Sequence, residues 1–345
     1  EYSSNVVLNL FLKIVCLFIC IGLSVSCADE ATDSNPEQRF IPTSPCENGM
    51  AGDYPCDGYD LMSHLSIQEL TASGSAEDLI ANDSWGWTDP STNKEYALVG
   101  LSSHTAFVDI SNPVVPILVG VLPTATVSSL WRDIKVYQNH AFIVSEAPGH
   151  GMQVFDLTRL RAVSTPPETF TADTHFTDFG RAHNIVINET SGYAYIVGTS
   201  RSGTYAGGAL FVNIQNPTMP VSEGGFGAGG YSHDAQVITY TGPDPDHLGK
   251  ELLIGSNENE IVIADITDKS NPIIISTIGY SNIGYTHQGW FTEDFNYFIV
   301  GDEDDERSFG NNTKTLVFDF KDLDNPSFSF NYFGPTAAID HNGYT

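Results

Sequence analysis

Positively charged residues are scarce in this chain, which has 14 Lys and Arg against 43 Asp and Glu and a formal net charge of −29. A surface of this sign repels the phosphate backbone, so the composition argues against nucleic acid as a partner. Cations and cationic partners are its natural complement. Long apolar runs are scarce too. The only one covers residues 6–25, so contact with a membrane is expected only through an N-terminal anchor.

The first 26 residues have the layout of a secretory signal peptide. Residues 14–23 form a compact apolar stretch that is short for a bilayer, and three small residues follow it. Cys27 and the Ala-Asp-Glu after it resemble a bacterial lipoprotein site, although Ser24 stands where such sites usually have Leu. Three outcomes stay open: lipidation of Cys27, cleavage without lipid, and an uncleaved membrane anchor. We therefore expect an exported protein, either at the bacterial outer cell surface or extracellular.

Two short regions separate the signal peptide from the rest of the chain. Residues 27–44 are polar and contain proline, which is typical of a disordered tether. Residues 45–84 contain Cys46 and Cys56, together with one short helical pattern at residues 60–70. The other three cysteines leave with the signal peptide or lie at the lipoprotein site. In an exported chain we expect a disulfide between Cys46 and Cys56, with two free thiols as the alternative.

From Trp85 onward the sequence repeats a unit of about 50 residues. Two landmarks mark the copies, an opening histidine or aspartate and a closing aspartate or asparagine. The opening residues are Asp133, His183, His233, His287 and His341, and the closing residues are Asp109, Asp156, Asn213, Asp265 and Asp319. Two independent landmarks that keep step are strong evidence for a structural repeat.

Each copy has the pattern of four short β-strands separated by turn-forming residues. In one copy the strand-like runs cover residues 289–292, 297–300, 314–320 and 327–332. A four-stranded unit of this length is typical of a propeller blade, which buries its faces by stacking on its neighbours. The predicted fold is therefore all-β: a β-propeller over residues 85–345, with five complete blades and the start of a sixth. We expect a fragment truncated at the C-terminus, from an intact protein of six or seven blades.

Several long motifs resemble one family. The runs CENGMAGDYPC, RAHNIVINETSGYAYIVG and YTHQGWFTEDFNYFIVGDEDDE are similar to the choice-of-anchor B family of exported proteins, which contain LVIVD-type propeller repeats. The resemblance covers residues 46–345. It implies a secreted or surface-tethered propeller with about two blades more than are present here. It implies no catalytic residues.

The repeat places many polar residues at one mouth of the propeller axis, because the loops that open a blade share a face with the loops between its second and third strands. The candidate ligand or metal residues are His183, His233, His287, His341, Asp133, His150, His104, Asp234 and Asp340. Neutral imidazoles suit Zn, Cu, Ni or Fe, and the nearby carboxylates suit Ca or a supporting role. The alternative for each histidine is structural, with its ring bonded to the backbone of a neighbouring blade.

The acidic loop GDEDDERSFGNN offers a second possible ion site. Asp302, Glu303, Asp304 and Asp305 could hold Ca, although the loop lacks EF-hand spacing and could simply be solvated.

The sequence favours a binding or interaction module that is exported, tethered to the surface, and recognises a protein or glycan ligand or an ion through this mouth. Two alternatives stay open. One is a metal-dependent hydrolase or oxidoreductase that uses the same histidines, and the other is a purely structural adhesion scaffold. No signature for a catalytic nucleophile supports an enzyme. The Ser-His-Asp letters at residues 232–234 are neighbours on one strand, and no GxSxG motif is present.

Overall fold

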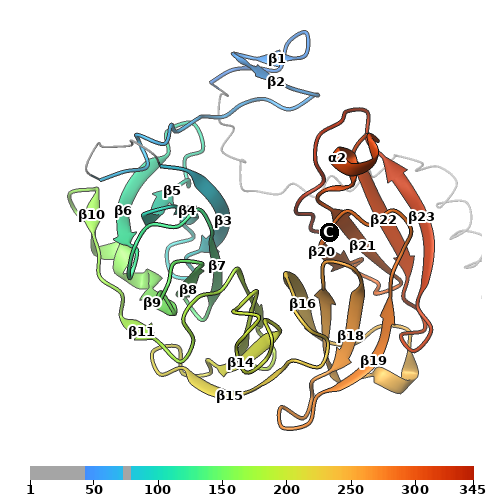
Figure 1. Ribbon diagram of the computed structural model, residues 1–345. Helices are drawn as coiled ribbons and strands as arrows, with labels where there is room; N and C mark the ends of the chain where they lie inside the picture. Colours follow the sequence, from blue (N-terminus) through green and yellow to red (C-terminus); the bar gives the residue numbers. More distant parts are fainter. Residues whose placement is uncertain (1–42, 73–78) are drawn as a thin grey trace, which may run out of the picture. The chain divides into compact units, whose positions relative to one another are not determined.

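A computed structural model describes residues 43–72 and 79–345 of the chain. The predicted signal peptide, Cys27 and almost all of the tether lie outside these described residues. Between residues 81 and 333, five sheets with four antiparallel strands each follow one another around a common axis (Figure 1). This arrangement confirms the predicted β-propeller.

The blades follow the repeat read from the sequence. The first two blades are β3 (Ala81–Thr88), β4 (Glu95–Leu101), β5 (His104–Asp109) and β6 (Ile117–Pro123), then β7 (Arg132–Tyr137), β8 (His140–Ser145), β9 (Met152–Asp156) and β11 (Thr174–Phe176). The next two are β12 (Asn184–Asn188), β13 (Tyr193–Val197), β14 (Ala209–Asn213) and β15 (Val221–Phe226), then β16 (Asp234–Thr239), β17 (Glu251–Ser256), β18 (Ile261–Asp265) and β19 (Ile273–Ile278). The fifth is β20 (Thr286–Phe291), β21 (Tyr297–Asp302), β22 (Lys314–Asp319) and β23 (Ser327–Phe333).

The hydrophobic cores lie between neighbouring blades. Phe107 of the first blade stacks on Phe155 of the second with ring centroids 4.7 Å apart, and both rings are fully buried. Similar clusters join each later pair of blades. A single four-stranded sheet cannot bury both faces, so the alternating apolar residues of each strand are satisfied only by this stacking. The inner strands β3, β7, β12, β16 and β20 contact one another in that order.

The second blade departs from the simple pattern. After β9 the chain forms the 3-10 helix η1 (Leu157–Ala162), and β10 (Glu168–Thr169) then pairs in parallel with the outer strand β6 of the first blade. Arg161 of η1 holds Asp89 of the first blade by two hydrogen bonds of 2.8 and 2.6 Å. These contacts fasten the first two blades together from the outside.

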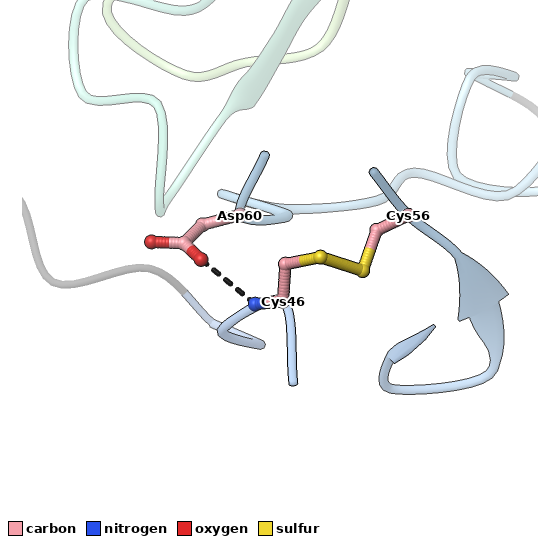
Figure 2. The surroundings of a disulfide bond; sticks show 3 residues. All are labelled: Cys46, Cys56 and Asp60. Carbon is pink, nitrogen blue, oxygen red and sulfur yellow. Dashed lines mark hydrogen bonds between the residues drawn. A yellow bond between two sulfur atoms is a disulfide. The ribbon is translucent and has the colours of Figure 1, made fainter. Parts of the chain in front are cut away.

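The N-terminal segment contains the expected disulfide (Figure 2). Cys46 and Cys56 are bonded, with their Cα atoms 5.9 Å apart, beside the short strands β1 (Met50–Ala51) and β2 (Tyr54–Pro55). The backbone N–H of Cys46 also donates to the carboxylate of Asp60 at 2.7 Å.

The helix predicted at residues 60–70 is wrong. The segment is irregular, with only a turn near its end. Leu65, Ile67 and Leu70 pack against an apolar cluster of the first blade that includes Leu101 and Val108. Tertiary packing therefore overrides the local helical pattern, because an irregular path brings these side chains onto the sheet.

Two further short helices lie in loops. One is the 3-10 helix η2 (Pro245–His247), and the other is α2 (Asp305–Phe309), which occupies the acidic loop where no helix was expected. Among residues 43–72 and 79–345, no helix is both long and apolar enough to cross a membrane.

Candidate functional site

The inner strands surround a cavity of about 260 Å³, called the axial cavity below. All five blades contribute to its wall through residues that lie in their inner strands or directly before them. Its charged and imidazole lining consists of Asp83, Arg132, Asp133, Lys135, Glu146, His183, Asp234, His233, His287, Glu303 and His341. The aromatic lining consists of Trp131, Tyr231, Tyr285, Trp290 and Tyr344.

Four histidines form a continuous stack along the cavity wall, called the histidine ladder below. The ring centroids are 4.2 Å apart between His183 and His233, 4.4 Å between His233 and His287, and 4.2 Å between His287 and His341. His183 and His233 directly precede β12 and β16, and His287 lies at the start of β20. The blade repeat therefore produces the ladder, since equivalent positions of neighbouring blades face one another across each interface.

Backbone carbonyl groups orient two of these rings. His233 Nδ1 lies 3.2 Å from the carbonyl oxygen of His287, and His287 Nδ1 lies 3.1 Å from that of His341. A carbonyl oxygen only accepts, so Nδ1 carries the proton in both rings and Nε2 keeps a free lone pair. This contact is the structural role that the sequence left open. It is also the arrangement that commonly orients an imidazole for a metal ion.

The middle of the ladder stays uncharged at neutral pH. Burial, together with the neighbouring imidazoles, lowers the pKa of His233 to about 3 and that of His287 to about 2. At the first ring of the ladder, His183 Nδ1 donates to Glu146 at 2.7 Å. This hydrogen bond holds the pKa of the Glu146 carboxyl below its ordinary value. Metal ions bind neutral imidazole, so the buried rings need lose no proton to act as ligands.

One part of the axial cavity gathers three metal-ligating groups. His287, Glu303 and His341 each offer a donor atom, and all three atoms lie within 4.8 Å of one another. His287 Nε2 is 3.7 Å from Glu303 Oε2, which is too long for a direct hydrogen bond. The acidic loop supplies Glu303, while the first strand of the fifth blade and the segment after β23 supply the two histidines.

A second group with metal-ligand spacing, Asp244, His247 and Asp324, has its own internal partners. Asp244 accepts the N–H of Leu323 at 2.8 Å. His247 Nε2 lies 2.9 Å from Asp324, and its Nδ1 lies 3.4 Å from the ammonium of Lys250. The ammonium of Lys250 contacts the second ring nitrogen of His247, so both ring nitrogens have partners. The group therefore connects the η2 loop to the loop before β23.

Buried carboxylates occupy another part of the axial cavity. Asp83 accepts the backbone N–H of Ile134 at 2.9 Å, and Asp133 accepts that of Ile185 at 2.7 Å. Each aspartate therefore binds the inner strand of the next blade. Burial and the nearby Asp133 raise the pKa of Asp83 to about 8. The same two causes raise the pKa of Asp234 to about 6.

Three of the predicted site residues lie outside the lining of the axial cavity. His104 Nε2 bonds the carbonyl of Leu70 at 2.9 Å, and His150 is fully buried against Arg132 at 3.2 Å. Asp340 accepts from the hydroxyl of Thr315 at 3.0 Å. Their loops are on the expected face, but His104 contacts the N-terminal segment, His150 contacts β7 of its own blade, and Asp340 contacts β22. Asp133 does line the cavity, yet it binds Ile185 and does not extend the histidine ladder.

The acidic loop does not gather the four carboxylates proposed for Ca. Asp302 accepts the backbone N–H groups of Gly284 and Tyr285 at 2.8 and 2.6 Å. Asp304 pairs with Arg307 at 3.2 Å, and Asp305 pairs with the buried Lys314. Only Glu303 faces the axial cavity. Internal partners thus already use three of the four acids, and the calcium site stays a prediction.

Several residues of the cavity could not be identified from the sequence. Asp83, Lys135 and Tyr344 carry no repeat landmark, and they reach the axis only through the register of the blades. Gly198 is a further support. Its φ is +63°, and a Cβ at this position would lie 2.3 Å from the Cβ of His183. A glycine is therefore required behind the first ring of the ladder.

The LVIVD repeat family matches residues 94–124 and 249–278, which fall in the first and fourth blades. Among solved structures, the chain is similar to a functionally unknown protein from Desulfotomaculum acetoxidans, with 15% identity, 74% of this chain and 70% of that chain covered, and a TM-score of 0.49. It is similar to a putative 6-phosphogluconolactonase from Bacteroides uniformis, with 13% identity, 75% and 72% covered, and a TM-score of 0.48. It is also similar to the Cps50 (Swd1) β-propeller domain of Myceliophteria thermophila, with 8% identity, 74% of each chain covered, and a TM-score of 0.42. No curated protein matches the chain. The five blades of the structure and the two family matches together describe a β-propeller that carries LVIVD repeats.

Proposed function

We propose that this chain is an exported, surface-tethered binding propeller of the choice-of-anchor B type, and that its axial cavity binds a divalent transition-metal ion. The observation that carries the proposal is the convergence of His287, Glu303 and His341, whose donor atoms lie within 4.8 Å of one another on the cavity wall. Two imidazoles and one carboxylate form a donor set suited to Zn, Fe, Ni or Cu, and less suited to Ca.

The surroundings of the three groups support this assignment. The Nδ1 atom of His287 is held by a backbone carbonyl, so its Nε2 lone pair is free for an ion. Glu303 is half-exposed on the cavity side and makes no hydrogen bond to His287 that an ion would have to break. Three protein ligands would leave at least one coordination position open toward the cavity. A ligand with an oxygen or nitrogen donor, such as a glycan or a protein side chain, could bind there.

A metal-dependent hydrolase is the second candidate, and one observation favours it. Asp83 lies in another part of the same cavity, where burial and the neighbouring Asp133 raise the pKa of its carboxyl. A carboxyl with a raised pKa, in a cavity that also offers metal ligands, is a usual candidate for general acid catalysis. The two candidates differ in turnover, because the binding module captures a ligand and releases it unchanged.

Export rests on the N-terminal pattern and on two properties of the chain. The Cys46–Cys56 disulfide suits an oxidising compartment, and the net charge of −29 suits a solvent-exposed surface protein. Expression with the N-terminal region intact, followed by cell fractionation, tests this part. A Cys27→Ser variant that leaves the membrane fraction would support lipidation. Retention of that variant in the membrane fraction would contradict it.

Metal content tests the central proposal. The purified chain is equilibrated with equimolar Zn, Fe(II), Ni and Cu, freed of unbound ions, and measured by inductively coupled plasma mass spectrometry. We expect about one ion per chain in the wild type and a large loss in His287→Ala and Glu303→Gln. His64→Ala is the matched control, since His64 is exposed and contacts the ring of Tyr54 outside the cavity. Equal metal content in all four proteins would refute the proposal.

A further inference from the structure

Within the axial cavity, three carboxylates face a single ammonium group. Asp83, Asp133 and Asp234 are called the axial acid cluster below, and Lys135 is the cation beside them. Lys135 already has partners within the fold. Its Nζ donates to Asp133 Oδ1 at 2.7 Å and to the carbonyl of Ile134 at 3.2 Å, and it lies 4.5 Å from the centre of the Trp85 ring. Lys135 therefore neutralises Asp133. Burial and the nearby Asp133 raise the pKa of Asp83, so Asp234 is the acid of the cluster that is left without a counter-ion.

Asp234 is the unpaired member of the cluster. Its side chain is only 9% exposed, yet the residue lines the cavity. One carboxylate oxygen accepts the N–H of Ala235 at 2.7 Å, and among the described residues neither oxygen has an ion pair. A buried carboxylate without a positive partner is costly in a region of low dielectric, so the site favours the entry of a cation.

The walls and size of the cavity indicate which kind of cation fits. Trp290 and Tyr344 meet edge to face, with ring centroids 4.9 Å apart, and both line the cavity next to the cluster. Aromatic faces attract ammonium groups and also cover alkyl chains. The volume of about 260 Å³ far exceeds the roughly 15 Å³ that one water needs on this scale. The space therefore suits a small organic molecule better than a bare ion.

We propose that the axial acid cluster is a binding site for a primary alkylammonium ion, which donates hydrogen bonds to Asp234 and places its alkyl chain against Trp290 and Tyr344. This site is separate from the proposed metal ligands and requires no metal. It gives the chain a second recognition element in the same cavity, and this element selects for a protonated amine in whatever group enters it.

Calorimetric titration of the purified, chelator-treated chain tests the proposal. The probe is n-butylammonium, and n-butanol is its neutral counterpart of nearly the same shape. We expect saturable binding of the amine and none of the alcohol. Asp234→Asn, which keeps the shape and removes the charge, should weaken amine binding at least tenfold. Asp53→Asn, a change at an exposed aspartate of the N-terminal segment, should leave it unchanged.

Other outcomes would overturn the proposal. Equal binding of the alcohol, or unchanged amine binding in a folded Asp234→Asn chain, would show that the attraction between Asp234 and the ammonium group does not drive binding. Displacement of the amine by equimolar sodium would assign the cluster to an inorganic cation. If Asp234→Asn does not fold, Tyr344→Leu replaces it, and unchanged affinity there would remove the role of the aromatic wall. Because metal content is measured separately, His287→Ala should lose the metal and keep amine binding.

Discussion

Lowering the pH from 7 to 5 should destabilise the folded chain through its buried histidines, and His150 is one whose contribution can be isolated. Its ring is fully buried and makes two short contacts, to Arg132 Nη1 at 3.2 Å and to the carbonyl of Gly151 at 3.0 Å. Burial, reinforced by the charge of Arg132, lowers the pKa of His150 from 6.5 to about 4. At a pH between these two values, the His150 imidazole is protonated in the unfolded chain and neutral in the folded chain. Stability is therefore lost as the pH falls from 6.5 toward 4.

The size of the effect follows from the two pKa values. With 6.5 for the unfolded chain and about 4 for the folded chain, proton binding to the unfolded state lowers the free energy of unfolding by about 2 kcal/mol at pH 5. At pH 7 the same calculation gives only about 0.2 kcal/mol. We therefore expect His150 alone to contribute about 2 kcal/mol to the difference between the two conditions.

Urea denaturation at pH 7 and pH 5 measures this difference in the wild type and in His150→Gln. Glutamine does not titrate, and its amide oxygen can accept from Arg132, so the variant should lose about 2 kcal/mol less than the wild type on acidification. His64→Gln, at an exposed histidine, serves as the control and should behave like the wild type. Identical pH dependence in wild type and His150→Gln would refute the reasoning.

Three further changes have defined consequences. Glu251→Ala should lower the free energy of unfolding by about 3 to 5 kcal/mol in a denaturant titration, because it removes the buried carboxylate that lies 2.5 Å from the ammonium of the partly buried Lys269; a loss below 1 kcal/mol would contradict this. Gly198→Ala should shift the NMR signals of the His183 ring while those of His64 stay fixed, because the new Cβ would overlap His183. Phe298→Ala should cost about 3 to 5 kcal/mol, since Phe298 is fully buried between the fourth and fifth blades; an unchanged melting temperature would rule that out.

The repeat made the fold predictable from sequence, because strand alternation and turn residues are local signals that occur in every blade. His233 and His287 illustrate this. Their place before or at the start of an inner strand follows from the spacing of the repeat, and the structure puts their rings 4.4 Å apart. The helix expected at residues 60–70 shows the limit of the approach, since its outcome depended on a sheet surface that the local pattern does not contain.

The composition of the cavity was less predictable, because it depends on distance from the axis. A loop assignment gives the face of the propeller on which a residue lies, but it does not give the distance of its side chain from the propeller axis. His104 and His150 lie on the expected face, and yet His104 bonds Leu70 of the N-terminal segment and His150 packs against Arg132 of its own blade. Asp305 looked like a free calcium ligand until the fold brought Lys314 beside it. Partners that are distant in sequence decide such cases, and a single sequence does not reveal them.

X-ray diffraction at the zinc absorption edge, from crystals of the chain grown with zinc, tests the central claim most directly. The account predicts one strong anomalous peak in the axial cavity, within about 2.0 to 2.2 Å of nitrogen atoms of His287 and His341 and of a carboxylate oxygen of Glu303. An empty axial cavity in crystals that hold zinc elsewhere, for example at Asp244, His247 and Asp324, would contradict it.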